Sequence, residues 1–176
     1  MSEDGSTTVW LFITALCVGG AERTLVDLAN GLDEGYDVTV WTVFSATPLA
    51  ADLEDGIAVR SLAPGGEAEP DRRERPDLIH SFLYLDNVIA GLAGLISPAA
   101  VITGVRSVPD DPGRLRALAD WLTIRLSDRI VSNSGAGREL AVDRGAPADR
   151  VSVVHNGRPL TTYRDAAAVD AQFLVD

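Results

Sequence analysis

The chain has 176 residues, and its 26 acidic and 15 basic side chains leave a formal net charge of -11 at pH 7. This length suffices for one domain with a normal hydrophobic core. An anionic surface repels the phosphates of nucleic acids and of anionic lipids, so we expect no nucleic-acid partner. The single cysteine, Cys17, excludes an internal disulfide and a thiolate zinc cluster.

The charged residues are unusual in kind, because every basic residue is an arginine and aspartate far outnumbers glutamate. Such a surface keeps a protein hydrated in concentrated salt, where self-repulsion is screened. We interpret the chain as an acidic, halophilic protein; a GC-rich genome is the alternative, and it explains the aspartate excess less well. Residues 1–5 are acidic where a secretory signal would be basic, which predicts a cytoplasmic location.

The first predicted strand covers residues 8–14, a run rich in β-branched and aromatic side chains. A loop ending in Gly19 and Gly20 follows, and then a helix with Leu25, Ala29 and other apolar residues on one face. This order brings backbone N–H groups and a positive helix end toward a phosphate. Adjacent glycines also let a ligand approach the main chain. The alternative is a tight turn that binds no ligand.

Strands and helices alternate along the rest of the chain. Strands are predicted at residues 36–43, 57–62, 78–81, 100–105, 129–132 and 151–154, and helical segments at 49–53, 86–95, 114–126 and 136–143. This alternation predicts an α/β fold: one doubly wound, Rossmann-like parallel sheet of six or seven strands with helices on both faces. The link at residues 63–76 has no apolar periodicity, so we expect it to lack a helix.

Two apolar stretches could be mistaken for membrane segments. Residues 87–105 are uncharged and long enough to span a bilayer, but Pro98 divides them into a helix and a strand. Residues 114–129 combine arginines with Leu118, Trp121 and Leu122, as a membrane-surface helix would. We favour a helix that faces the core, because nearby aspartates offset the arginines. We therefore expect no transmembrane segment.

Ligands of open α/β sheets bind at the carboxyl ends of the strands. The candidate substrate-binding residues at these ends are Gly19, Gly20, His80, Arg106, Asn133 and Ser134. No pair of carboxylates, no Ser-His-Asp set and no metal cluster emerges, so the catalytic residues stay unassigned and we expect no metal and no cofactor.

Several of these candidates have a plainer interpretation. His80 either donates to a sugar hydroxyl or phosphate or packs against backbone. Arg106 either binds a phosphate or carboxylate or pairs with Asp110 or Asp111. Ser134 is most simply the N-cap of the helix that follows it.

Four segments, taken in order, carry a resemblance to a known family. Residues 19–32 begin Gly-Gly-Ala-Glu-Arg, residues 75–81 read Arg-Pro-Asp-Leu-Ile-His-Ser, residues 130–134 read Ile-Val-Ser-Asn-Ser, and residues 153–157 read Val-Val-His-Asn-Gly. Together they resemble the N-terminal half of family-4 retaining glycosyltransferases with the GT-B fold. Phe82 departs from the family's "HxH" pattern, in which the second histidine often faces the cleft.

The resemblance implies an acceptor-side domain at residues 1–160. The apolar residues of the tail at 161–176 leave two alternatives for it, a helix docked on the sheet or a disordered terminus. It implies transfer of a sugar from a nucleotide-sugar donor to a glycan or lipid-linked acceptor. The family's donor-binding domain is not in this sequence, so we expect the chain to need a separate donor-domain chain or a homo-oligomer. A lipid-linked acceptor would place it at the inner membrane face. The alternative is a non-catalytic binding or pairing module.

Overall fold

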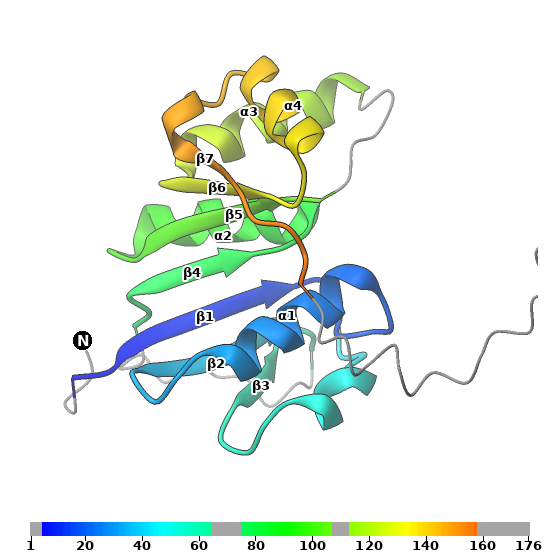
Figure 1. Ribbon diagram of the computed structural model, residues 1–176, viewed down its shortest axis with the longest axis vertical. Coiled ribbons are helices and arrows are strands. Elements are labelled where there is room, and N and C mark those ends of the chain that lie inside the picture. Colours follow the sequence, from blue (N-terminus) through cyan, green and yellow to red (C-terminus); the bar gives the residue numbers. More distant parts are fainter. Residues whose placement is uncertain (1–4, 65–74, 107–112, 158–176) are drawn as a thin grey trace, which may run out of the picture.

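The computed structural model describes residues 5–64, 75–106 and 113–157. Its centre is one parallel sheet of seven strands in the order β3-β2-β1-β4-β5-β6-β7 (Figure 1). The strands are β1 (Thr7–Ile13), β2 (Tyr36–Thr42), β3 (Ala58–Ser61), β4 (Leu78–Ser81), β5 (Ala100–Val105), β6 (Arg129–Ser132) and β7 (Val151–Val153).

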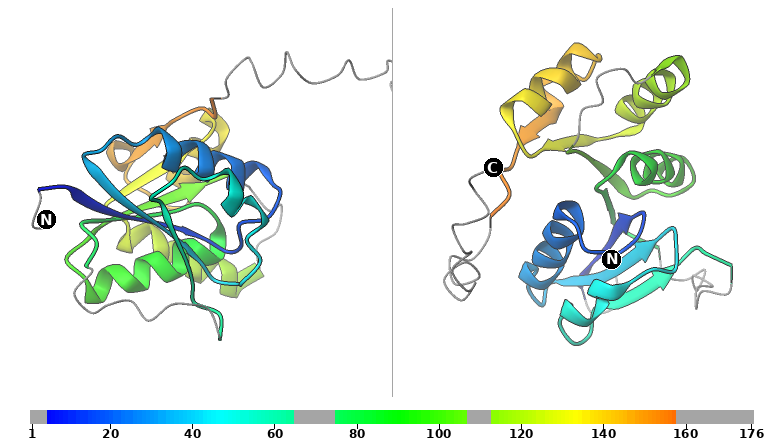
Figure 2. Two further views of the ribbon diagram at one scale, coloured as in Figure 1. Left: turned by 90° about the horizontal axis from the view of Figure 1, so that it is seen from below. Right: turned by 90° about the vertical axis from the view of Figure 1, so that its right-hand side faces the viewer.

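Helices follow most of the strands and cover both faces of the sheet (Figure 2). They are α1 (Gly20–Gly31), α2 (Tyr84–Ile96), α3 (Gly113–Leu126) and α4 (Gly135–Asp143), with short 3₁₀ helices η1 (Pro48–Asp52) and η2 (Ala148–Arg150). The prediction of a doubly wound Rossmann-like sheet with helices on both faces is confirmed. Each predicted strand and helix is present, with ends that differ by at most two residues.

The alternation of side chains along the strands assigns each helix to a face. Val9 and Leu11 of β1 pack against Leu25 and Ala29 of α1 on one face. Phe12 and its neighbours pack on the other face against α2. The clusters on that second face continue through Ile130, Ala141 and Val151, which join β6, α4 and β7. Apolar side chains buried on both faces explain why the central strands read as nearly continuous apolar runs.

The order of strands reverses between β1 and β4, which lie side by side in the middle of the sheet. Chain connections run from β1 to β2 on one side and from β4 to β5 on the other. Such a switch point opens the carboxyl edge of a parallel sheet to ligands. The predicted place of the Gly19-Gly20 turn, directly after a central strand, is therefore confirmed.

Helix α3 crosses between β5 and β6 as expected, but the residues that it turns toward the sheet differ from those that the sequence indicated. Thr123 and Ser127 are buried, and the Ser127 hydroxyl lies 2.9 Å from the Thr103 hydroxyl of β5. Leu118, Trp121 and Leu122 are instead exposed. The prediction that these apolar residues face the core is wrong, because Thr123, Ile124 and Ser127 occupy the inward side of this segment.

Two expectations lie outside the described residues: the tail at 161–176 and most of the link at 63–76. Among the residues that are described, no helix combines the length and apolarity needed to cross a membrane.

Candidate functional site

A buried carboxylate joins the two loops at the switch point. Asp86, in the first turn of α2, accepts hydrogen bonds from the Thr14 hydroxyl at 2.7 Å and from the Leu83 backbone N–H at 3.1 Å. The side chain is 0% exposed. Burial raises the pKa of Asp86 to about 6, although both hydrogen bonds act in the opposite direction. The loop after β1 is thereby tied to the loop after β4.

Asn87 makes a second connection, between α2 and the ends of β4 and β5. Its side-chain oxygen accepts from the Ser81 hydroxyl at 2.7 Å and from the Gly104 N–H at 3.2 Å. Its amide donates to the Gly104 carbonyl at 2.8 Å. A Cβ at Gly104 would lie 2.9 Å from the Ser81 carbonyl oxygen, so β5 approaches β4 too closely for any larger residue.

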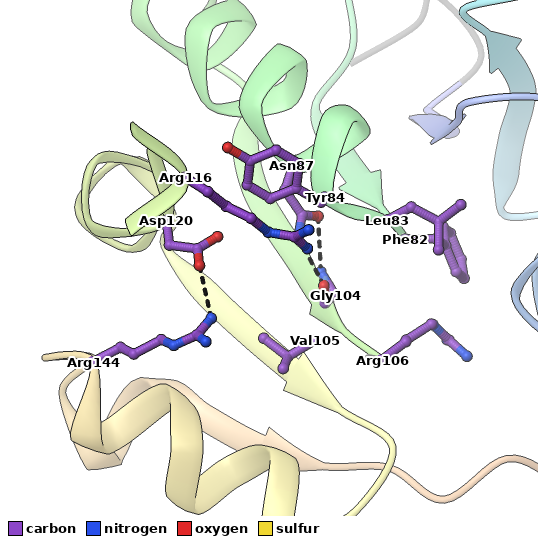
Figure 3. A pocket seen from close by; sticks show the side chains of 10 residues that line it. All are labelled: Phe82, Leu83, Tyr84, Asn87, Gly104, Val105, Arg106, Arg116, Asp120 and Arg144. Atoms are coloured by element: carbon purple, nitrogen blue, oxygen red, sulfur yellow. Dashed lines mark hydrogen bonds and ion pairs between the residues drawn. The ribbon is translucent and has the colours of Figure 1, made fainter. Parts of the chain in front are cut away.

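Beside this network lies a cavity of about 390 Å³ at the carboxyl edge of the sheet (Figure 3). Its walls come from the loop after β4, from α2, β5 and α3, and from the residue that follows α4. The lining residues are Phe82, Leu83, Tyr84, Asn87, Gly104, Val105, Arg106, Arg116, Asp120 and Arg144. A second cavity of about 350 Å³ adjoins it and shares Asn87, Val105, Asp120 and Arg144.

The cavity wall is cationic, in contrast to the chain as a whole. Arg144 forms an ion pair with Asp120, with 2.7 Å between Nη1 and Oδ2. The Arg116 guanidinium lies over the Tyr84 ring, 4.3 Å from its centroid. Its Nε is buried and has no hydrogen-bond partner in the described part of the structure. Asp120 therefore neutralises one of the two arginines, and the other can meet an anion.

Arg106 also lines the cavity, but its head group turns away from Arg116 and Arg144 (Figure 3). Its guanidinium lies over the Phe82 ring at 4.9 Å, and Nη1 donates to the Asn156 side-chain oxygen at 3.0 Å. Partial burial lowers the pKa of Arg106, which still leaves it charged. Arg106 thus links the end of β5 to the segment after β7. The alternative pairing with Asp110 or Asp111 lies outside the described residues.

His80 does not line the cavity. Its ring stacks on Phe82, with 4.5 Å between centroids. Burial, followed by the positive charge of Arg106, lowers the pKa of His80 to about 4, so the imidazole is neutral at pH 7. Nε2 is buried without a hydrogen-bond partner among the described residues. Contact between His80 and a sugar stays a prediction.

Asn133 and Ser134 lie at the same sheet edge, at the start of α4. The Ser134 hydroxyl accepts from the Gly137 N–H at 3.1 Å, which confirms its interpretation as the N-cap. The Asn133 carbonyl lies 3.1 Å from Nδ1 of His155. These contacts hold the segment after β7 against the end of β6. A direct role of either residue in substrate binding stays a prediction.

The glycine turn after β1 is separate from the cavity. Gly19 is the N-cap of α1, and a Cβ there would overlap the Glu22 carboxylate. A Cβ at Gly20 would meet open space. The negative charge at the positive end of α1 is thus supplied by the helix itself. Phosphate binding at this turn stays a prediction, and Glu22 would have to move to allow it.

Several cavity residues were not singled out from the sequence. Tyr84 and Asn87 belong to a helix that the sequence showed only as small and apolar. Arg116 was noted merely as one of the arginines that flank an apolar helix, although its spacing of four residues from Asp120 places both on one helix face. Arg144 enters the site only through the ion pair that joins α4 to α3.

Comparison with known proteins gives a consistent picture. The family model described as Glycosyltransferase Family 4 matches residues 18–161. The chain is 27% identical to a D-inositol 3-phosphate glycosyltransferase of Thermobispora bispora, over 88% of this chain and 45% of that protein. A protein with the same description from Nocardia farcinica is 27% identical, over 85% of this chain and 41% of that protein. The chain thus spans about half the length of the curated relatives it matches.

Solved structures agree on the fold. Anabaena HepE in complex with UDP-glucose superposes with a TM-score of 0.70 at 20% identity, over 89% of this chain and 45% of that one. A glycosyltransferase from Rickettsia africae superposes with a TM-score of 0.68 at 17% identity, over 96% of this chain and 48% of that one. At these identities the similarity establishes the architecture alone: this chain has the fold of one half of each of those proteins.

Proposed function

Because the chain belongs to Glycosyltransferase Family 4, we propose that it forms the acceptor-side half of a GT-B glycosyltransferase. In this role it binds an acceptor at the carboxyl edge of its sheet, and a sugar is transferred from a nucleotide-sugar donor. Family membership favours this role over a non-catalytic binding or pairing module. The chain spans about half the length of its relatives, and we propose that it works together with a donor half, in a separate donor-domain chain or a homo-oligomer.

The observation that carries the proposal is the cavity beside Arg116. The cavity lies at the carboxyl edge of the sheet, where ligands of open α/β sheets bind. Arg116 has no carboxylate partner among the described residues, although acidic side chains outnumber basic ones by 26 to 15. A cation left unpaired in an acidic protein is best explained by an anionic ligand. We therefore assign the cavity to an acceptor that carries a phosphate.

The relatives support this assignment, because they are described as acting on inositol 3-phosphate. On this chain the Arg116 guanidinium would bind the phosphate. The Tyr84 hydroxyl and the Asn87 amide line the same cavity and would bind hydroxyl groups of the inositol ring. These residues orient the acceptor. Catalysis then depends on positioning and on stabilisation of the leaving diphosphate, for which this half supplies the acceptor's position.

The proposal is tested by calorimetric binding of inositol 3-phosphate and of inositol to the 176-residue chain. We expect the phosphorylated compound to bind at least about tenfold more tightly, since a charge-assisted hydrogen bond contributes about 1.5–3 kcal/mol. Arg116→Gln should abolish this difference. Arg150→Gln, which removes an exposed arginine of η2 outside the cavity, should preserve it. Equal affinities for the two compounds in the wild-type chain would contradict the assignment.

A second measurement addresses the donor half. Sugar transfer to the same phosphorylated acceptor is followed with the chain alone and with a candidate donor-domain chain. We expect turnover only with both chains present, because nucleotide-sugar binding belongs to the other half. Turnover by the 176-residue chain alone would contradict the proposal that this chain binds only the acceptor and that another chain binds the nucleotide sugar. The cytoplasmic location, the attachment to the inner membrane face and the halophilic interpretation stay predictions.

A further inference from the structure

Helices α2 and α3 present an apolar outer surface that the fold does not cover. They lie side by side on the face of the sheet opposite α1 (Figure 2), and Leu126 of α3 packs against Gly91 of α2. We name their outer surface the α2–α3 face. Its exposed apolar side chains are Leu85, Leu92, Leu95 and Ile96 of α2 and Leu118, Trp121 and Leu122 of α3.

Packing within the chain does not require these side chains. The inner side of α2 uses small residues: a Cβ at Gly91 would lie 3.3 Å from Leu126, and one at Gly94 would overlap Val101 of β5. Ile96, by contrast, is 91% exposed and Leu95 is 64% exposed. Leucine and isoleucine at such positions are favourable only if something else removes them from water.

The charge distribution singles out the same surface. The thirteen residues of α2 include one charged side chain, Asp86, which is fully buried. On α3 the Arg125 guanidinium lies over the Trp121 ring at 4.4 Å, and Asp120 is engaged with Arg144. Among the described residues, the α2–α3 face thus carries no exposed carboxylate, in a chain with a net charge of -11.

From this pattern we propose that the α2–α3 face is the interface between two copies of this chain, related by a twofold axis. An apolar surface is complementary to itself, so an isologous contact needs no pairing of opposite charges. It is also where two anionic molecules can approach without bringing carboxylates together. An anionic membrane is a poorer partner, because its surface repels the rest of the molecule. The proposal does not depend on the proposed acceptor.

The interface would leave the candidate site open and support its walls. Tyr84 and Asn87 on α2, and Arg116 on α3, line the cavity from the first turns of these helices. The exposed residues of the α2–α3 face extend to the far ends of the same helices, at Ile96 and Trp121–Leu122. A second copy packed there fixes α2 against α3 and holds the arginine opposite the tyrosine.

The test is the mass of the 176-residue chain in solution, measured by sedimentation velocity and light scattering over a range of concentrations and in low and high KCl. We expect a dimer, strengthened by salt because salt screens the repulsion between copies. The double variant Leu92→Glu with Leu118→Glu should weaken dimerisation about a hundredfold or more. Phe44→Glu, at an exposed phenylalanine after β2, serves as the matched control and should remain dimeric.

Circular dichroism and thermal melting show whether the double variant remains folded, and its surface positions predict that it does. A wild-type chain that is monomeric at every concentration and salt level overturns the proposal. So does a dimer that survives the double variant. A monomeric chain that sediments with vesicles of neutral phospholipid, and loses this property in the double variant, also overturns it and identifies the surface as a lipid contact.

Discussion

Two places at the carboxyl edge of the sheet differ in how their charges are satisfied. At the turn between β1 and α1, the positive helix end meets the Glu22 carboxylate of its own first turn. At the cavity between β4 and β5, Arg116 is held over Tyr84 with its Nε buried and unpartnered among the described residues. At the turn the charges are neutralised within the helix, whereas at the cavity Arg116 could pair with an anion.

The close approach of β5 to β4 at Gly104 predicts a large effect of substitution on stability. Gly104→Ala would place a Cβ 2.9 Å from the Ser81 carbonyl oxygen and 3.2 Å from the Phe82 Cα, both of them main-chain atoms. We expect the free energy of unfolding to fall by about 1–3 kcal/mol, as for overpacked cores. Gly20→Ala meets no atom within 4 Å and is the control.

Urea denaturation of the two glycine variants measures this difference. The Gly20 variant should stay within about 0.5 kcal/mol of the wild-type chain. Equal stability of the two variants would contradict this prediction. It would show that the backbone at Gly104 accommodates a Cβ as easily as the backbone at Gly20 does.

Asp86, which joins the loop after β1 to the loop after β4, predicts that the stability of the chain depends on pH. Because the pKa of folded Asp86 is raised to about 6 from 3.8, the folded chain binds more protons than the unfolded chain between these values. The contribution of Asp86 to stability is therefore fully present below pH 3.8 and is lost as pH rises through 6. The loss is on the order of 2–3 kcal/mol, at 1.36 kcal/mol per pKa unit.

Comparison of the wild-type chain with Asp86→Asn isolates this contribution. The asparagine keeps an acceptor for Thr14 but cannot ionise, so the stability of the variant relative to the wild-type chain should rise between pH 4 and pH 7. Asp143→Asn, at an exposed position at the end of α4, should show no such trend. A constant difference between wild type and Asp86→Asn across this range would mean that Asp86 ionises as an ordinary aspartate.

The smallest expected effect concerns the turn between β1 and α1, where the Glu22 carboxylate lies at the positive end of its own helix. Glu22→Gln removes the negative charge from the first turn of α1, and we expect the free energy of unfolding to fall by about 0.3–1 kcal/mol at low ionic strength. The loss should shrink as KCl is added, since salt screens the interaction. Thermal melting at several salt concentrations checks this, with Glu139→Gln on α4 as the control. A salt-independent loss would indicate packing by the glutamate stem in place of charge.

Much of the fold was predictable because local patterns decide it. Runs such as residues 8–14 and 100–105 are apolar enough to be strands buried on both faces, and glycine or polar residues separate them from helices. Strand and helix ends therefore agree with the prediction within two residues. Because the strand ends could be predicted, the residues at the carboxyl edge of the sheet could be predicted as well. Arg106, one of them, lines the cavity at that edge.

The rest depends on contacts between distant residues, which local patterns do not encode. The rotation of α3 is one case: its leucines suggested a core-facing side, but in the folded chain Thr123 is buried and Leu118 is exposed. The Thr103 hydroxyl of β5 is hydrogen-bonded to the Ser127 hydroxyl just after the helix, a contact between distant residues that the local pattern does not show. The isolation of Gly19 from the cavity is another, because only the folded chain shows where the Glu22 carboxylate lies.

The sequence by itself thus determined the class of fold, the alternation and extent of its elements and the sheet edge at which a ligand would bind, since these follow from periodicity and from the parallel arrangement of strands. The tertiary structure alone decided which side chains meet at that edge. Tyr84, Arg116 and Arg144 belong to three different segments, and they converge only because packing against one sheet brings those segments together. Burial likewise decided the raised pKa of Asp86, because desolvation exists only in the folded chain.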